Sequence, residues 1–263
     1  MSVVVTEAIV LHVFDYLESS RIFRLVTREA GVRSVLARGA RRSARRFGSA
    51  LDLFAQGTAE LHVKAGRDLD TLGRFDIERA RPALGADLSR FTGAAVIAEL
   101  TLRFGRDAAD PELFDAAAAA LDDLASAPAH DTREATLAGA WHVIASLGFA
   151  PGLDVCAECH TSLEPNEAVL FSHPAGGALC PRCGRRAPSG RLLPASARTA
   201  LRAWTAGERT TLSGDPEMRA HQRLLREFLR EHLSDDRPLP AFEMWEEDPV
   251  HANQFVATGR TET

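Results

Sequence analysis

The sequence predicts an α+β protein with more than one domain, and three observations lead to this prediction. The first 80 or so residues alternate apolar and polar side chains in short runs, as half-buried strands do. After Pro82 the apolar residues recur at three- and four-residue spacing, which is typical of helices. All four cysteines lie between Cys156 and Cys183, within the helical part. We therefore expect a small barrel or sandwich, then a helical domain with an inserted cysteine module.

The N-terminal domain, residues 1–80, is expected to contain five short strands. The runs that predict them are residues 3–14, 22–26, 32–37, 58–63 and 69–77. Five short strands separated by glycine-containing turns are typical of a small closed barrel or a sandwich.

The helical domain is expected over residues 81–240. Asp110 followed by Pro111 has the N-cap and first-turn residues of a helix, and Asp131 with Glu134 resembles a capping box. Gly148 is a stop signal. Apolar periodicity predicts the helices at residues 91–104, 111–124, 131–147, 195–206 and 215–233.

The C-terminal part and the last predicted helix hold further expectations. His221 and His232 lie on one apolar face of that helix, where we expect packing histidines rather than metal ligands. Residues 241–263 form an acidic and polar tail, of which only residues 242–245 are expected to dock on the domain.

The four cysteines form two Cys-x-x-Cys pairs, Cys156 with Cys159 and Cys180 with Cys183, separated by twenty residues. Such a turn, or knuckle, directs two sulfurs toward one point, so two knuckles can surround one tetrahedral ion. Zinc is the usual occupant. Because four thiolates leave no coordination position open, we expect one structural Zn²⁺ per chain, in a module at residues 151–190.

Disulfides are the alternative use of four cysteines, and they suit secreted proteins. Residues 1–7 lack the basic and long apolar regions of a secretion signal, which favours metal. His160 and His173 lie near the cysteines in sequence, but the four sulfurs already fill a tetrahedral shell, so we expect both histidines to be bystanders. No apolar run approaches the roughly 18 residues of a membrane span, so we expect no membrane association.

Arginine is concentrated in two segments, although the net charge of the chain is −5. Nine arginines and one acid lie in residues 21–46, and six arginines and no acid lie in residues 182–202. Guanidinium groups bind phosphates through paired hydrogen bonds and stack on bases, so the first segment favours nucleic-acid binding over a merely solvated loop. The loop arginines that we expect to contact DNA are Arg38, Arg41, Arg42, Arg45 and Arg46. The aromatic candidates for base stacking are Phe14, Tyr16, Phe23, Phe47 and Phe54, although most of the phenylalanines are expected in the core.

The sequence contains no recognised catalytic motif. The nucleophile elbow, the Walker phosphate loop, the HExxH metal site and the dinucleotide-binding glycine pattern are all absent. We therefore expect a protein that is not an enzyme.

Five motifs, in their order and spacing, resemble the bacterial recombination mediator family RecO. They are Glu-Ala-Ile-Val-Leu at residues 7–11, Asp-Tyr-Leu-Glu-Ser-Ser-Arg-Ile at 15–22, Val-Thr-Arg-Glu-Ala-Gly at 26–31, Ala-Arg-Gly-Ala-Arg-Arg at 37–42 and Leu-Gly-Phe-Ala-Pro at 147–151. The resemblance covers about residues 3–230. It implies an OB-fold N-terminal domain, binding of single- and double-stranded DNA, and annealing of complementary strands. It also implies work with RecR and the single-stranded DNA-binding protein to load RecA, and hence a cytoplasmic, nucleoid-associated location.

The same resemblance suggests that the acidic C-terminal tail of the single-stranded DNA-binding protein docks on the helical domain. Such a tail needs a basic rim around an apolar pocket, and Arg198, Leu201 and Arg202 on one predicted helix are the candidates. The alternative is that Leu201 belongs to the core and the arginines are only solvated. Two other functions stay open: a zinc-containing RNA-binding or transcription factor, and a zinc-stabilised protein-interaction adaptor.

Overall fold

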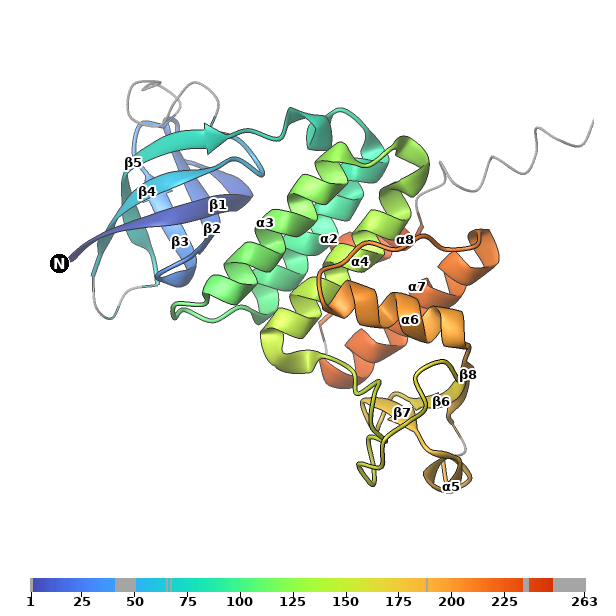
Figure 1. The fold of residues 1–263 in the computed structure, drawn as a ribbon. Coiled ribbons are helices and arrows are strands. Elements are labelled where there is room, and N and C mark those ends of the chain that lie inside the picture. The colour runs from blue at the N-terminus through green and yellow to red at the C-terminus, as the bar shows by residue number, and fades with distance from the viewer. Residues whose placement is uncertain are drawn as a thin grey trace, which may run out of the picture.

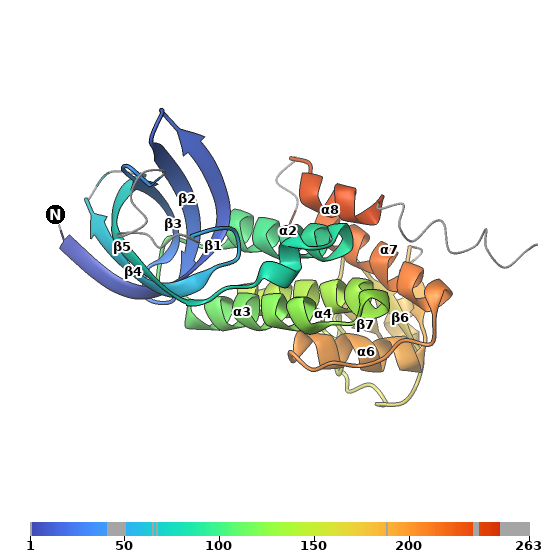
Figure 2. The same ribbon diagram turned by 90° about the horizontal axis from the view of Figure 1, so that it is seen from above.

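The computed structural model describes residues 2–40, 51–64, 66, 68–187, 189–233 and 237–247. A closed five-stranded barrel is followed by a bundle of helices, and a small three-stranded sheet lies at the end of the bundle remote from the barrel (Figures 1 and 2). This is the α+β architecture that the sequence predicts.

The barrel is formed by β1 (Ser2–Tyr16), β2 (Ser20–Thr27), β3 (Gly31–Ala37), β4 (Gln56–Val63) and β5 (Asp70–Arg79), in the order β1-β2-β3-β5-β4. The long strand β1 pairs with β4 through its first half and with β2 through its second half. The barrel closes through a short parallel pairing of β3 with β5. Alternate residues point inward and fill the interior with buried apolar side chains, as period-two patterning requires.

The turn between β2 and β3 attaches the barrel to the helices. Gly31 has φ +70°, and a Cβ atom there would lie 2.2 Å from the carbonyl oxygen of Arg106, so only glycine fits this approach. The Val32 backbone N–H donates to the same oxygen at 2.9 Å. Beside it, Arg28 bonds Asp115 and lies 4.6 Å over the ring of Phe114. One end of the barrel is therefore held against the helical domain.

The helical domain follows the predicted pattern closely. Its elements are η1 (Pro82–Gly85), α2 (Leu88–Phe104), α3 (Pro111–Ser126), η2 (Ala129–Asp131), α4 (Thr132–Ile144), the π-helical turn η3 (Ala145–Phe149), α6 (Ala195–Thr205), α7 (Asp215–His232) and α8 (Pro240–Glu246). Asp110 caps α3 by accepting from the N–H of Leu113 at 3.0 Å, as predicted. The predicted capping box is wrong, because the Asp131 side chain makes no cap bond and Glu134 accepts instead from the N–H of Leu212.

The core of this domain lies where α4, α6 and α7 meet. Trp141 on α4 packs edge-on against Phe228 on α7, with ring centroids 5.0 Å apart, and Trp204 on α6 is fully buried. Phe242 and Trp245 of α8 are also buried, which confirms the docking predicted for that stretch. Within the described residues, no helix is both long and apolar enough to cross a membrane.

Candidate metal centre and nucleic-acid interface

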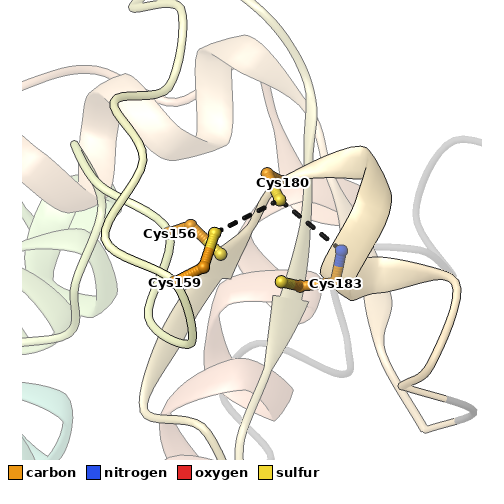
Figure 3. A group of neighbouring side chains, drawn as sticks. All are labelled: Cys156, Cys159, Cys180 and Cys183. Carbon is orange, nitrogen blue, oxygen red and sulfur yellow. Dashed lines mark hydrogen bonds between the residues drawn. The ribbon is translucent and has the colours of Figure 1, made fainter.

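The four cysteines come together in the module that interrupts the helices. Cys156 and Cys159 lie on the loop after η3, and Cys180 and Cys183 lie at the short helix α5 (Pro181–Gly184) (Figure 3). The strands β6 (Val169–Ser172), β7 (Gly177–Leu179) and β8 (Arg191–Leu193) support them. The module thus brings two knuckles that are distant in sequence to face each other.

The sulfur atoms have the spacing that a single metal ion requires. All four lie within 4.8 Å of one another, and the sulfurs of Cys159 and Cys180 are 3.7 Å apart (Figure 3). None is in a disulfide. The backbone N–H of Cys183 donates to the sulfur of Cys180 at 3.5 Å, a contact that stabilises a thiolate.

The surroundings of the sulfurs also favour a cation. Hydrogen bonds from the hydroxyl and backbone of Thr161 lower the pKa of Cys159 to about 5. Burial opposes ionisation of Cys156, but backbone N–H groups outweigh it and its pKa is lowered. Burial and the neighbouring sulfurs raise the pKa of Cys183 to about 12. Several thiolates this close repel one another unless a cation lies between them, so this donor set fits a thiophilic metal ion.

The two nearby histidines are placed as bystanders. His160 is exposed on the first knuckle. The Nε2 atom of His173 lies 3.0 Å from the carboxylate of Glu227 on α7, so its ring is engaged with a helix and not with the sulfurs. The predicted packing role of His221 also agrees with its burial beside Trp204, at a ring distance of 4.7 Å.

Arg198 has a role that the sequence did not indicate. Its guanidinium is fully buried and donates to the Leu153 carbonyl from Nε at 3.0 Å and from Nη2 at 2.7 Å. Nη1 donates to the carbonyls of Glu164 and Glu167. Leu153 and Glu167 lie at the two ends of the loop that carries the first knuckle. Arg198 thereby fastens both ends of this loop to α6.

This burial corrects the expected partner site. Arg198 and Leu201 are both fully buried, so neither side chain is available to a partner at the surface. Arg202 is partly exposed, but it pairs with Asp154 at 2.5 Å and donates to the Pro165 carbonyl at 3.1 Å. No sequence signal identifies these carbonyl partners, because they become neighbours of α6 only when the module folds.

The arginine-rich N-terminal segment divides into a structural and an exposed part. Arg21 pairs with Asp15, Arg24 donates to the Leu102 carbonyl, Arg28 pairs with Glu7 and Asp115, and Arg33 lies 3.7 Å from Asp70. Arg38 is exposed just after β3 and has no ion-pair partner among the described residues. Arg41, Arg42, Arg45 and Arg46 lie outside the described residues.

Exposed aromatic side chains lie at the same end of the barrel as Arg38. The register pairs Asp15 with Arg21 and Arg21 with Ala37, so the β1–β2 turn and the end of β3 are neighbours. Phe14 and Tyr16 near that turn are 46% and 42% exposed. Of the other aromatic candidates, Phe23 and Phe54 are buried and Phe47 lies outside the described residues. This end is opposite the β2–β3 turn that attaches to the helices.

A closed five-stranded barrel joined to a helical domain with a paired-knuckle cysteine site defines a class of two-domain, OB-fold proteins. Comparison with known families identifies which one. Residues 1–81 match the family described as recombination protein O N terminal, and residues 85–239 match recombination protein O C terminal. The chain belongs to the RecO family of DNA repair proteins, which confirms the resemblance found in its motifs.

Similar proteins carry the same description. The chain is 37% identical over 233 residues to "DNA repair protein RecO" of Anaeromyxobacter sp. (strain K), covering 86% of this chain and 89% of the relative. It is 36% identical over 230 residues to the protein of that name from Myxococcus xanthus (strain DK1622), covering 86% and 91%. For Geobacter sulfurreducens the identity is 39% over 184 residues, covering 68% and 72%.

Proposed function

We propose that this chain is a recombination mediator without enzymatic activity that binds single- and double-stranded DNA, anneals complementary strands and assists RecA loading with RecR. The observation that supports DNA binding best is the set of side chains at the free end of the barrel, meaning the end with the β1–β2 turn, opposite the turn that attaches to the helices. There, exposed Arg38 lies at the same end of the barrel as exposed Phe14 and Tyr16, and Arg41, Arg42, Arg45 and Arg46 follow it in the sequence. Guanidinium groups for phosphates and aromatic rings for bases are the two components of single-strand recognition.

Electrostatics provides the mechanism of annealing. Arginine contacts neutralise phosphates and release their condensed counterions, which drives binding without regard to sequence. Once part of their charge is neutralised, two complementary strands repel each other less and can pair. Annealing requires no covalent step, which agrees with a chain in which we expect no catalytic residues.

The metal has a structural role in this proposal. Cys156, Cys159, Cys180 and Cys183 would hold one Zn²⁺. The ion would cross-link the module, and its four sulfur ligands would leave no coordination position open for a substrate. The cysteines and Arg198 then fix the module to α6.

Partner binding belongs to the same proposal. We expect the acidic tail of the single-stranded DNA-binding protein to dock on the helical domain, with Arg202 as the remaining candidate contact. A tail carboxylate would have to displace Asp154 from that guanidinium. Arg202→Glu is expected to abolish binding of an isolated tail peptide in a fluorescence-polarisation titration while annealing persists. Unchanged peptide affinity would place the tail site elsewhere.

The decisive experiment replaces Arg41, Arg42, Arg45 and Arg46 with alanine. If each contacts one phosphate of a single strand, the log–log salt slope of binding becomes shallower by about 3, at roughly 0.7 per contact. A control with equal charge change replaces Arg219, Arg223, Arg226 and Arg230 on α7 and should keep the wild-type slope. Equal slopes for the loop variant and the wild type would refute the assignment.

An RNA-binding function is the second candidate, because phosphate contacts alone do not distinguish the two nucleic acids. Annealing of complementary DNA oligonucleotides in the presence of competitor RNA separates the two functions. Complete inhibition by equimolar RNA, with tighter RNA binding, would favour the RNA function.

A further inference from the structure

Contacts within the fold explain only some of the arginines in the second arginine-rich segment, residues 182–202. Of its six arginines, four have roles within the molecule. Arg198 binds backbone carbonyls, Arg202 pairs with Asp154, and Arg191 pairs with Glu227 at 2.7 Å. Arg182 faces the cysteine sulfurs, whose hydrogen bonds and charge raise its pKa.

Arg185 and Arg186 remain, and both are exposed. Neither has an ion-pair or hydrogen-bond acceptor for its guanidinium among the described residues. Their backbone is nevertheless fixed, because the N–H of Arg186 donates to the Cys183 carbonyl at 3.0 Å and the N–H of Gly184 donates to the Cys180 carbonyl at 2.8 Å. The turn that presents these two charges is thus an extension of the second knuckle.

An exposed leucine flanks this turn. Leu192 on β8 is 72% exposed and pairs with Leu170 on β6. The Leu170 side chain lies against Gly184, where an added Cβ would be 3.1 Å from it. Leu192 therefore lies on the same face of the small sheet as α5, the helix that the turn with Arg185 and Arg186 follows.

We infer that Arg185 and Arg186 form a second phosphate-binding surface, with which the metal module contacts the backbone of DNA. We call it the module surface. It deepens the proposed function and rests on it, because it assumes that the chain binds DNA through the barrel. The module and the barrel lie at opposite ends of the helical bundle (Figures 1 and 2). A protein that anneals strands gains from contacts at both ends, since bound DNA can then extend along the molecule.

Charge favours DNA over an acidic protein as the partner. Residues 182–202 contain no acid, and the four acids of the module, Asp154, Glu158, Glu164 and Glu167, lie on the other loop, where Asp154 is paired with Arg202. Two arginines on one rigid turn can bind successive phosphates, each through paired hydrogen bonds. Phosphate contacts of this kind carry no sequence preference.

The test compares the wild type with R185A/R186A in fluorescence-anisotropy titrations of a single-stranded oligonucleotide over a range of salt concentrations. Loss of two phosphate contacts should make the log–log slope shallower by about 1.4, at roughly 0.7 per contact. The control R223A/R230A removes two exposed arginines from α7 and should keep the wild-type slope. Metal content and thermal melts of both variants should match the wild type, because none of these four guanidinium groups has a hydrogen-bond acceptor among the described residues.

A wild-type slope in R185A/R186A, together with weakened binding in the variant of the barrel loop, would overturn the module surface and leave the proposed function intact. An equal loss of slope in R223A/R230A would also overturn it, since the effect would then be one of net charge. Failure of the wild type to bind any DNA would refute the proposed function itself. If R185A/R186A lost affinity only for a polyglutamate peptide, the surface would be a protein contact and the inference wrong.

Discussion

Replacing Arg198 with methionine tests whether the buried guanidinium holds the metal module to α6. Methionine keeps an unbranched apolar stem but lacks the guanidinium, so the carbonyls of Leu153, Glu164 and Glu167 lose their buried donor. Each unsatisfied buried acceptor costs about 1–3 kcal/mol. Removal of the buried charge also removes the cost of its desolvation, which offsets part of this loss. With three carbonyls left without their donor, we expect a net loss of about 3 kcal/mol in the free energy of unfolding.

The same substitution should weaken metal binding, because the loop that Arg198 holds carries Cys156 and Cys159. If about 2 kcal/mol of the loss comes from disorder of this loop in the metal-free protein, the metal affinity falls roughly 30-fold, at about 1.4 kcal/mol per factor of ten. Urea unfolding gives the stability, and competition with a chromophoric chelator gives the affinity. Arg202→Met is the control: its pair with Asp154 is partly exposed and should contribute at most about 1 kcal/mol. Wild-type stability and metal affinity in R198M would refute this reasoning.

Three further predictions concern the cysteine site, a buried histidine and the domain junction. Cys156→Ser should lower metal content below one ion per chain, measured by atomic absorption, and destabilise the module more than it weakens DNA binding. Burial lowers the pKa of His221 to about 4, whereas an unfolded histidine titrates near about 6.5, so the unfolded chain takes up protons first as the pH falls. Stability should therefore be full above about pH 6.5 and decline toward pH 4 by up to about 3 kcal/mol, and urea melts of His221→Phe should show a shallower decline. Gly31→Ala forces a Cβ against the Arg106 carbonyl and should lower the free energy of unfolding by about 2–4 kcal/mol. Gly39 has a similar φ but open space around it, so Gly39→Ala is the control and should cost about 1 kcal/mol. Equal melting temperatures of the two variants would contradict this prediction.

The parts of the fold that depend on local patterns could be predicted from the sequence. Alternation predicted the barrel strands, and Asp110 with Pro111 predicted the start of α3, because strand faces and helix caps are encoded by residues close in sequence. The knuckle spacing likewise predicted the cluster of four sulfurs.

The contacts between distant segments could not be predicted. Arg198 on its helix has the pattern of an ordinary surface arginine, and only the folded loop of residues 153–167 supplies the carbonyls that bind it. In the same way, Arg28 and Arg33 belong to the basic segment by sequence, but Arg28 pairs with Glu7 on β1 and Asp115 on α3, and Arg33 pairs with Asp70 on β5. A count of charges alone therefore overestimates how many arginines of each segment are available to bind a partner.

The shortest strand pairing in the barrel, between β3 and β5, is where we expect neighbouring strands to separate first. The parallel register of β3 with β5 extends over only two pairs, Val35 with Asp70 and Leu36 with Thr71, whereas the antiparallel pairings of β1 are several times longer. Regions with few hydrogen bonds exchange their amide protons through local opening at low free energy. Since the chain passes from this seam directly into residues 38–50, transient separation of β3 from β5 would widen the free end of the barrel. We therefore expect the amide protons of this seam to exchange sooner than those of the long β1 pairings, without unfolding elsewhere.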